Sequence, residues 1–116
     1  MARSEEEYKK AEYIRRRLPK NRYIKARFDA GRRPSGAKAF TITLEEYTQI
    51  ISQPCRYCGC DISQDTGSGI DRINNDLGYE PGNCSPCCPK CNTRRSKSMD
   101  ADIFEQQSRD NGYRVD

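Results

Sequence analysis

The sequence contains no histidine and no tryptophan, and only 34% of its 116 residues are hydrophobic, whereas 33% are charged. No apolar run approaches the roughly 20 residues needed to span a bilayer, so no membrane segment is expected. The opening residues, MARSEEEYKK, lack the apolar stretch of a secretory signal, which predicts a cytoplasmic protein. Without histidine, any catalytic site lacks the usual proton acceptor at neutral pH. A chain this short also buries a limited core, so additional stabilising links are expected.

Cysteine is abundant, with seven residues, and a reducing compartment favours metal ligation over disulfides. The strongest pattern is Cys55-x-x-Cys58 followed by Cys88-x-x-Cys91. Each pair lets two thiolates of one tight turn reach the same ion, and four thiolates fill a tetrahedral Zn²⁺ shell. Gly59 supplies the permissive backbone that such a turn requires. The sequence therefore predicts a structural zinc, with iron–sulfur ligation and free buried thiols as alternatives.

Three cysteines, Cys60, Cys84 and Cys87, remain outside these pairs. Each is expected to be a small buried residue, although Cys60 or Cys87 could replace a neighbour as a ligand. A shell of four sulfur atoms leaves no position for water, so this zinc is expected to hold the fold and to do no chemistry.

The positive charge is concentrated at the beginning of the chain. Residues 1–40 hold 13 Lys and Arg against 5 Asp and Glu, while residues 41–116 hold 8 against 12. A basic segment attracts a polyanion such as nucleic acid, although a solvated helix surface is the alternative. We expect a basic helical arm over 1–38 and a zinc-bound domain over 39–116. The predicted phosphate contacts in the arm are Arg15, Arg16, Arg17, Arg22, Lys25, Arg27, Arg32 and Arg33.

Capping patterns and apolar spacing predict an α+β fold. Ser4 with Glu7 and Thr43 with Glu46 form capping boxes, and Asp100 is a good helix N-cap. The predicted elements are a helix from Ser4 to near Pro19, a helix within 21–33 that Gly31 ends, a strand over 39–43, a helix over 44–52, and a helix within 99–112 that covers the zinc module.

The stretch IDRINNDLGYEPGNCSPCCPKCN, residues 70–92, joins Asp71, Asn83 and Asn92 to the second cysteine pair. Asn83 lies five residues before Cys88, and Asn92 directly follows Cys91. This order resembles the zinc-bearing HNH endonucleases, the ββα-metal group that includes phage endonuclease VII-like resolvases and homing enzymes. The resemblance covers about residues 55–98. It implies a treble-clef-like ββα-metal module that acts as a DNA endonuclease or nickase.

The resemblance also implies roles for individual residues. Asp71 and Asn92 would hold a catalytic Mg²⁺ or Mn²⁺, and a hard divalent ion does prefer carboxylate and carbonyl oxygens. Asn83 would orient the strand that carries Arg72. Taken singly, Asp71 could instead be a turn residue and Asn92 a helix cap.

Arg72 occupies the place where the family has a histidine that accepts a proton from water. Arginine stays protonated, so Arg72 is expected to bind the scissile phosphate. The water would then be activated by metal, by a phosphate oxygen or by Asp76. General-base help is worth about 10²–10⁴-fold, so its loss need not abolish turnover. The alternative is a catalytically inactive zinc-finger-type module that binds DNA or RNA. In either case Arg94, Arg95 and Lys97 are expected to contact mainly the phosphate backbone of DNA, with RNA as a further candidate.

Overall fold

The computed structural model describes residues 4–33, 36–95 and 99–113. Within these ranges the chain is a small α+β protein with five helices and a two-stranded sheet, in the order α1, α2, α3, β1, β2, α4, α5. None of the helices in the described ranges is long and apolar enough to cross a membrane.

The N-terminal segment forms two helices, α1 (Glu5–Arg17) and α2 (Pro19–Ala30). The hydroxyl of Ser4 accepts the backbone N–H of Glu7, and acidic residues in the first turn of α1 and basic residues in its last turn suit the helix dipole. Leu18 leaves the helical conformation because it precedes Pro19, which then begins α2. The second helix therefore starts earlier than the segment from which it was predicted, and it ends before Gly31 as expected.

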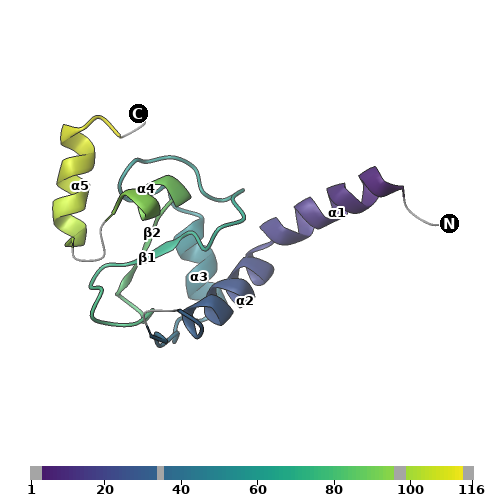
Figure 1. Cartoon of the computed structure of the whole chain (residues 1–116), viewed down its shortest axis with the longest axis horizontal. Coiled ribbons are helices and arrows are strands. Elements are labelled where there is room, and N and C mark those ends of the chain that lie inside the picture. The colour runs from purple at the N-terminus through teal and green to yellow at the C-terminus, as the bar shows by residue number, and fades with distance from the viewer. Residues whose placement is uncertain (1–3, 34–35, 96–98, 114–116) are drawn as a thin grey trace.

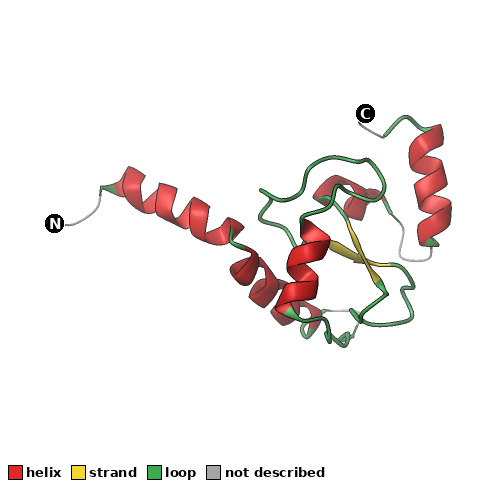
Figure 2. Ribbon diagram, turned by 180° about the vertical axis from the view of Figure 1, so that it is seen from behind, coloured by secondary structure: helices red, strands yellow, loops and turns green. Residues whose placement is uncertain are grey.

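Helix α2 packs against α3 (Leu44–Ile51). Thr43 and Glu46 form the predicted capping box, and Tyr47 and Ile51 of α3 are buried. Ala26 of α2 belongs to the same hydrophobic core. Helix α1 instead extends away from the body (Figures 1 and 2), which gives the molecule extents of 54 × 33 × 26 Å. The division of the chain at residues 38 and 39 stays a prediction, but α2 contributes to the core of the segment that follows.

Strands β1 (Ile70–Arg72) and β2 (Cys84–Pro86) pair antiparallel, with Asp71 opposite Ser85. Helix α3 contacts β2, and the short helix α4 (Pro89–Arg94) follows β2 directly (Figure 1). Two isolated strands are only marginally stable in water, so the hairpin depends on its packing partners.

The predicted strand over 39–43 was wrong, because only Phe40 forms a bridge, and its partner is Tyr79 in the loop between β1 and β2. The backbone N–H of Tyr79 donates to the carbonyl of Ala39 at 2.8 Å. A Cβ at Gly78 would lie 2.7 Å from the same carbonyl oxygen, so only glycine allows this approach. The segment thus pairs with a loop that lies far along the chain, and within the described residues no second extended partner continues the ladder.

Helix α5 (Ala101–Asp110) has Asp100 as its N-cap, and the Asp100 side chain accepts the N–H of Asp102. Phe104 is buried, and its ring centroid lies 4.7 Å from that of Tyr57. Tyr57 lies between Cys55 and Cys58 in the sequence. The guanidinium of Arg56 is 2.6 Å from a carboxylate oxygen of Asp102. The last helix therefore covers the turn of the first cysteine pair, as predicted.

Candidate metal centre and adjoining cleft

The structure brings the two cysteine pairs together. The Sγ atoms of Cys55, Cys58, Cys88 and Cys91 all lie within 4.8 Å of one another, and all four residues are buried. A tetrahedral ion with bonds to sulfur of about 2.3 Å separates its ligand atoms by about 3.8 Å. The Sγ atoms of Cys58 and Cys88 are already 3.6 Å apart. These four cysteines could hold a single structural metal such as zinc.

Local backbone geometry presents the sulfur atoms. In the first pair, the N–H of Gly59 donates to the carbonyl of Cys55 at 2.9 Å, and Gly59 has a φ of +82° that favours glycine. In the second pair, Cys88 is the N-cap of α4, and its sulfur accepts the N–H of Cys91. The N–H of Cys88 points in turn at the sulfur of Cys55, 3.3 Å away. Donors directed at sulfur favour thiolates, which are the form that binds a metal.

The thiols do not ionise independently. A hydrogen bond from Cys87, helped by backbone N–H groups, lowers the pKa of Cys55 to about 3. Burial, with the nearby Cys55 charge, raises the pKa of Cys88 and of Cys91. Four thiolates in one buried cluster need a cation to neutralise them, so metal binding and folding are expected to be coupled.

The three remaining cysteines lie outside the set of four that shares this geometry. Cys84 is half-buried and Cys87 is buried, with its Sγ 3.4 Å from the carbonyl oxygen of Cys88. Cys60 is half-buried at the edge of the cluster, with its Sγ 3.3 Å from that of Cys58.

A polar cleft of about 310 Å³ adjoins the hairpin and α4. Asp71 from β1 and Asn92 from α4 both line it, so two residues that are 21 positions apart border the same hollow. Asp71 lies in a strand and Asn92 lies inside α4, whose N-cap is Cys88, so neither is the turn residue or helix cap considered as an alternative. The cleft is lined by Arg33, Ser68, Ile70, Asp71, Arg72, Asn75, Tyr79, Asn92, Thr93 and Arg95.

Arg95 is buried, which corrects its prediction as a phosphate contact. Its Nη1 donates to Oδ2 of Asp71, and its other bonds reach the carbonyls of Arg72, Ile73 and Met99. Helix α4 ends at Arg94, and Arg95 follows it as the C-cap. The signal that could have identified this arginine is its spacing, because it lies four residues after the buried Cys91.

Tyr57 completes the environment of the Asp71 carboxylate. Its hydroxyl donates to Oδ2 of Asp71 at 2.7 Å and accepts from Nη1 of Arg95 at 3.2 Å. Burial and the Asp71 charge raise the pKa of Tyr57, so its proton stays on the oxygen. Burial alone would lower the pKa of Arg95, but the bond to Asp71 and the attraction of its charge raise it overall. Tyr57 was not predicted as a site residue, and its position between Cys55 and Cys58 is its only sequence signal.

Arg72 is directed into its own hairpin loop. Its Nη1 donates to the carbonyls of Asn75 at 2.7 Å and Leu77 at 3.1 Å, and its guanidinium lies 5.5 Å from the ring centroid of Tyr79. The residue is 8% exposed but still lines the cleft. Arg72 therefore supports the loop with one end of its guanidinium, in addition to any contact with a ligand.

Asn83 orders the same loop from the other strand. Its side-chain amide donates to the carbonyls of Asn74 and Gly78, and its Oδ1 accepts the N–H of Asn74. Its backbone carbonyl accepts the N–H of Ile73, directly after Arg72. Asn83 is thus bonded to the backbone on both sides of the loop that Arg72 holds.

Arg22 is the second predicted phosphate contact that the structure buries. It is 1% exposed, and its guanidinium donates to the carbonyls of Ile62, Ser63 and Gly67. A Cβ at Gly69 would lie 2.8 Å from Nη2 of Arg22, so glycine is required beside it. This arginine links α2 to the loop before β1 and is unavailable to nucleic acid.

The other predicted basic contacts in the described ranges remain at the surface. Arg33 donates to the hydroxyl of Tyr79 at 2.6 Å and lines the cleft. Arg15 is bonded to Glu12, and Arg17 lies over the ring of Tyr13. Lys97 lies outside the described residues. The exposed or half-buried members of the set are Arg15, Arg16, Arg17, Lys25, Arg27, Arg32, Arg33 and Arg94.

Charge in the cleft favours an anion. Among the described residues, three arginines, Arg33, Arg72 and Arg95, line it together with one carboxylate, that of Asp71. Positive charge in excess of negative in a concave, partly buried site attracts phosphate and opposes a free cation.

Comparison with known proteins gives one relative with no assigned function. An uncharacterized protein of Acanthamoeba polyphaga mimivirus is 40% identical over 57 residues, which is 49% of this chain and 11% of that protein. The match thus spans about a tenth of the length of the viral protein. No protein-family model matches the sequence, and no solved structure matches the chain.

Proposed function

We propose that this protein is an HNH-type metal-dependent DNA endonuclease or nickase. The observation that carries the proposal is the shared cleft: Asp71 in the first strand of the hairpin and Asn92 in the helix that follows the second strand line one hollow. The four-cysteine cluster lies at the start of that helix and ties it to the first cysteine turn. The order strand, strand, helix is also the order that the HNH resemblance implies.

Asp71 and Asn92 would provide the protein ligands of Mg²⁺ or Mn²⁺, which when bound polarises the phosphate and stabilises the leaving oxygen. Oδ2 of Asp71 is already engaged by Tyr57 and Arg95. Because arginines outnumber carboxylates in the cleft, the divalent ion is expected to bind weakly by itself and more tightly once a phosphate of DNA adds negative charge.

The protein's own groups hold the substrate. Arg33 and Arg72 are placed to pair with a phosphate that enters the cleft, and charge-assisted bonds of this kind are the stronger ones. Asp76 does not line this cleft but borders a neighbouring hollow with Met99 and Asp100. We therefore favour a phosphate oxygen or the divalent ion over Asp76 as the group that would activate the attacking water.

The second candidate function is a non-catalytic DNA- or RNA-binding module. Two observations favour it: the chain has no histidine, and the Asp71 carboxylate forms a buried ion pair with Arg95. Such a module would still use the exposed arginines of α1 and α2, together with Arg33 and Arg72 in the cleft, to bind the nucleic-acid backbone.

The deciding experiment is nicking of a supercoiled plasmid in Mg²⁺ or Mn²⁺, with DNA binding measured in parallel. We expect nicking by the wild type, a loss of about 10²-fold or more in Asp71→Asn and Asn92→Ala with binding retained, and normal nicking by the control Asp76→Asn. Binding without nicking in any metal would instead support the binding module. Nicking that survives in both Asp71→Asn and Asn92→Ala would refute the assigned site.

A further inference from the structure

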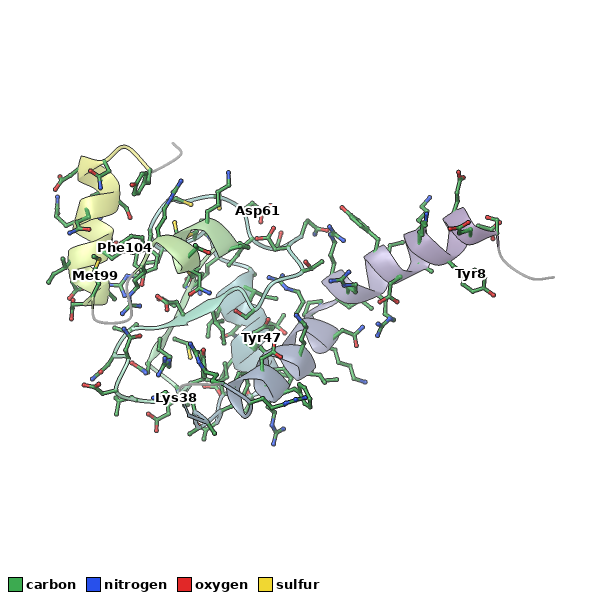
Figure 3. The ribbon with its side chains drawn as sticks, in the orientation of Figure 1. Tyr8, Lys38, Tyr47, Asp61, Met99 and Phe104 are labelled. Carbon is green, nitrogen blue, oxygen red and sulfur yellow. The ribbon has the colours of Figure 1, made fainter. Side chains whose placement is uncertain are left out.

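Helix α1 carries an apolar stripe that the rest of the described chain leaves uncovered. None of its residues is buried, and it extends away from the body, with Tyr8 projecting from its outer half (Figure 3). Tyr8, Ala11 and Ile14 recur at three-residue spacing and therefore share one face, and Leu18 follows the last residue of the helix. Tyr8, Ile14 and Leu18 are all exposed. Lys9, Glu12 and Arg16 border a hollow beside Thr66 of the body, and Tyr8, at the edge of the stripe, borders it as well.

The charges of α1 are arranged as opposites about its centre. Its first turn holds three glutamates, Glu5, Glu6 and Glu7, and its last turn holds three arginines, Arg15, Arg16 and Arg17. Ala11 lies midway, with Tyr8 and Ile14 three residues to either side and Glu7 and Arg15 four residues to either side. A helix with this pattern is complementary to itself when a second copy runs in the opposite direction.

We propose that α1 pairs antiparallel with α1 of a second copy of this chain, around a two-fold axis at Ala11. The small alanines permit close approach of the two helices at the axis. Tyr8 of each copy then lies at the level of Ile14 of the other, and Glu7 lies at the level of Arg15 of the other. The contact is isologous, so each complementary pair occurs twice.

The alternative occupants of this face fit less well. The three glutamates of the outer turn repel a nucleic-acid backbone, which would suit only the arginine end of the helix. In the single chain Arg15 is bonded to Glu12, but exposed pairs of this kind contribute little, so exchange of partners costs little. The pairing is independent of cleavage and would hold for an endonuclease or for a binding module.

The expected dimer is weak. A helix of 13 residues is about 20 Å long, and a pair of that length buries less area than the roughly 1,200–2,000 Å² of a stable interface. We therefore expect a dissociation constant in roughly the micromolar range. A concentration series covering that range is required to detect the dimer.

The test is sedimentation velocity of the full-length, zinc-loaded protein over such a concentration series. Ile14→Glu places a charge on the stripe, and its control is the neighbouring Tyr13→Glu on another face, since these side chains are similarly exposed, at 53% and 57%. We expect Ile14→Glu to weaken dimerisation by about tenfold or more and Tyr13→Glu to leave it near the wild-type value. Circular dichroism confirms that α1 remains helical in each variant.

A charge-reversal experiment tests the direction of the pairing. Glu7→Arg and Arg15→Glu are each expected to weaken the dimer, because each places like charges at the same level. A mixture of the two variants is expected to recover a heterodimer, in which one level joins the native Glu7 to the native Arg15 and the other joins the two substituted side chains, again with opposite charges. A wild type that stays monomeric throughout, equal effects of Ile14→Glu and Tyr13→Glu, or no recovery on mixing would each overturn the proposal. Loss of DNA binding in Ile14→Glu with an unchanged oligomeric state would overturn it in favour of nucleic acid as the occupant.

Discussion

The side chain of Arg95 joins the end of α4 to strand β1, and its replacement is the sharpest test of how the cleft is built. Arg95→Met keeps much of the side-chain length but removes the charge partner of Asp71. It also removes the donors to the carbonyls of Arg72, Ile73 and Met99. The side chains of Arg95 and Asp71 are only 3% and 11% exposed, so water cannot fully replace these bonds.

The expected loss of unfolding free energy in Arg95→Met is large. Removing one partner of a buried ion pair costs about 3–5 kcal/mol, because the other charge is left without compensation. Each orphaned carbonyl adds to this, although such terms are not additive. We expect Arg95→Met to lose about 4 kcal/mol of unfolding free energy, a large part of the roughly 5–15 kcal/mol of a typical domain. Asp71→Asn should lose less, about 1–3 kcal/mol, since Arg95 keeps its carbonyl partners.

The assay is equilibrium urea unfolding at a fixed free zinc concentration, followed by circular dichroism. Zinc must be held constant because ligand binding shifts apparent stability. The matched control is Arg94→Met, which alters the exposed neighbour that lies over the ring of Tyr113 and should cost about 1 kcal/mol or less. If Arg95→Met proves no more destabilising than Arg94→Met, the buried pair does not join α4 to the hairpin.

Three further predictions concern the cysteine cluster, Arg22 and Tyr57. If the cysteine cluster binds zinc, Cys91→Ser should contain no zinc by elemental analysis and its body should unfold, whereas Cys84→Ser should still bind zinc, since Cys84 lies outside the cluster. Arg22→Met should cost about 2 kcal/mol or more in urea unfolding because three carbonyls lose their donor, while the exposed Lys25→Met should cost almost nothing. Burial raises the pKa of Tyr57 above its ordinary value of about 10, so at higher pH the unfolded chain releases this proton first and stability falls. Tyr57→Phe removes this proton, so its stability should fall less as the pH rises. The measurement is the urea midpoint of each protein below and above pH 10, about the ordinary tyrosine pKa, and an equally steep fall in both proteins would contradict this.

Elements that depend on neighbours in the chain were predictable. The capping box of Thr43 with Glu46, the N-cap at Asp100 and the end of α2 before Gly31 all follow from hydrogen bonds within a single turn. The paired cysteine spacing likewise determined which four thiols meet, because each pair occupies one tight turn.

Partners that lie far apart in the chain were decided only by the tertiary structure. Phe40 was expected to sit in a strand, but its bridge is to Tyr79 in a loop. Arg22 and Arg95 look in the sequence like the exposed Lys25 and Arg94, yet they are buried. The carbonyls that Arg22 reaches are 40 to 45 residues away, and the carboxylate that Arg95 reaches is 24 residues away. Local sequence propensity does not predict such bonds, because a charged side chain is buried only where the folded chain brings acceptors to it.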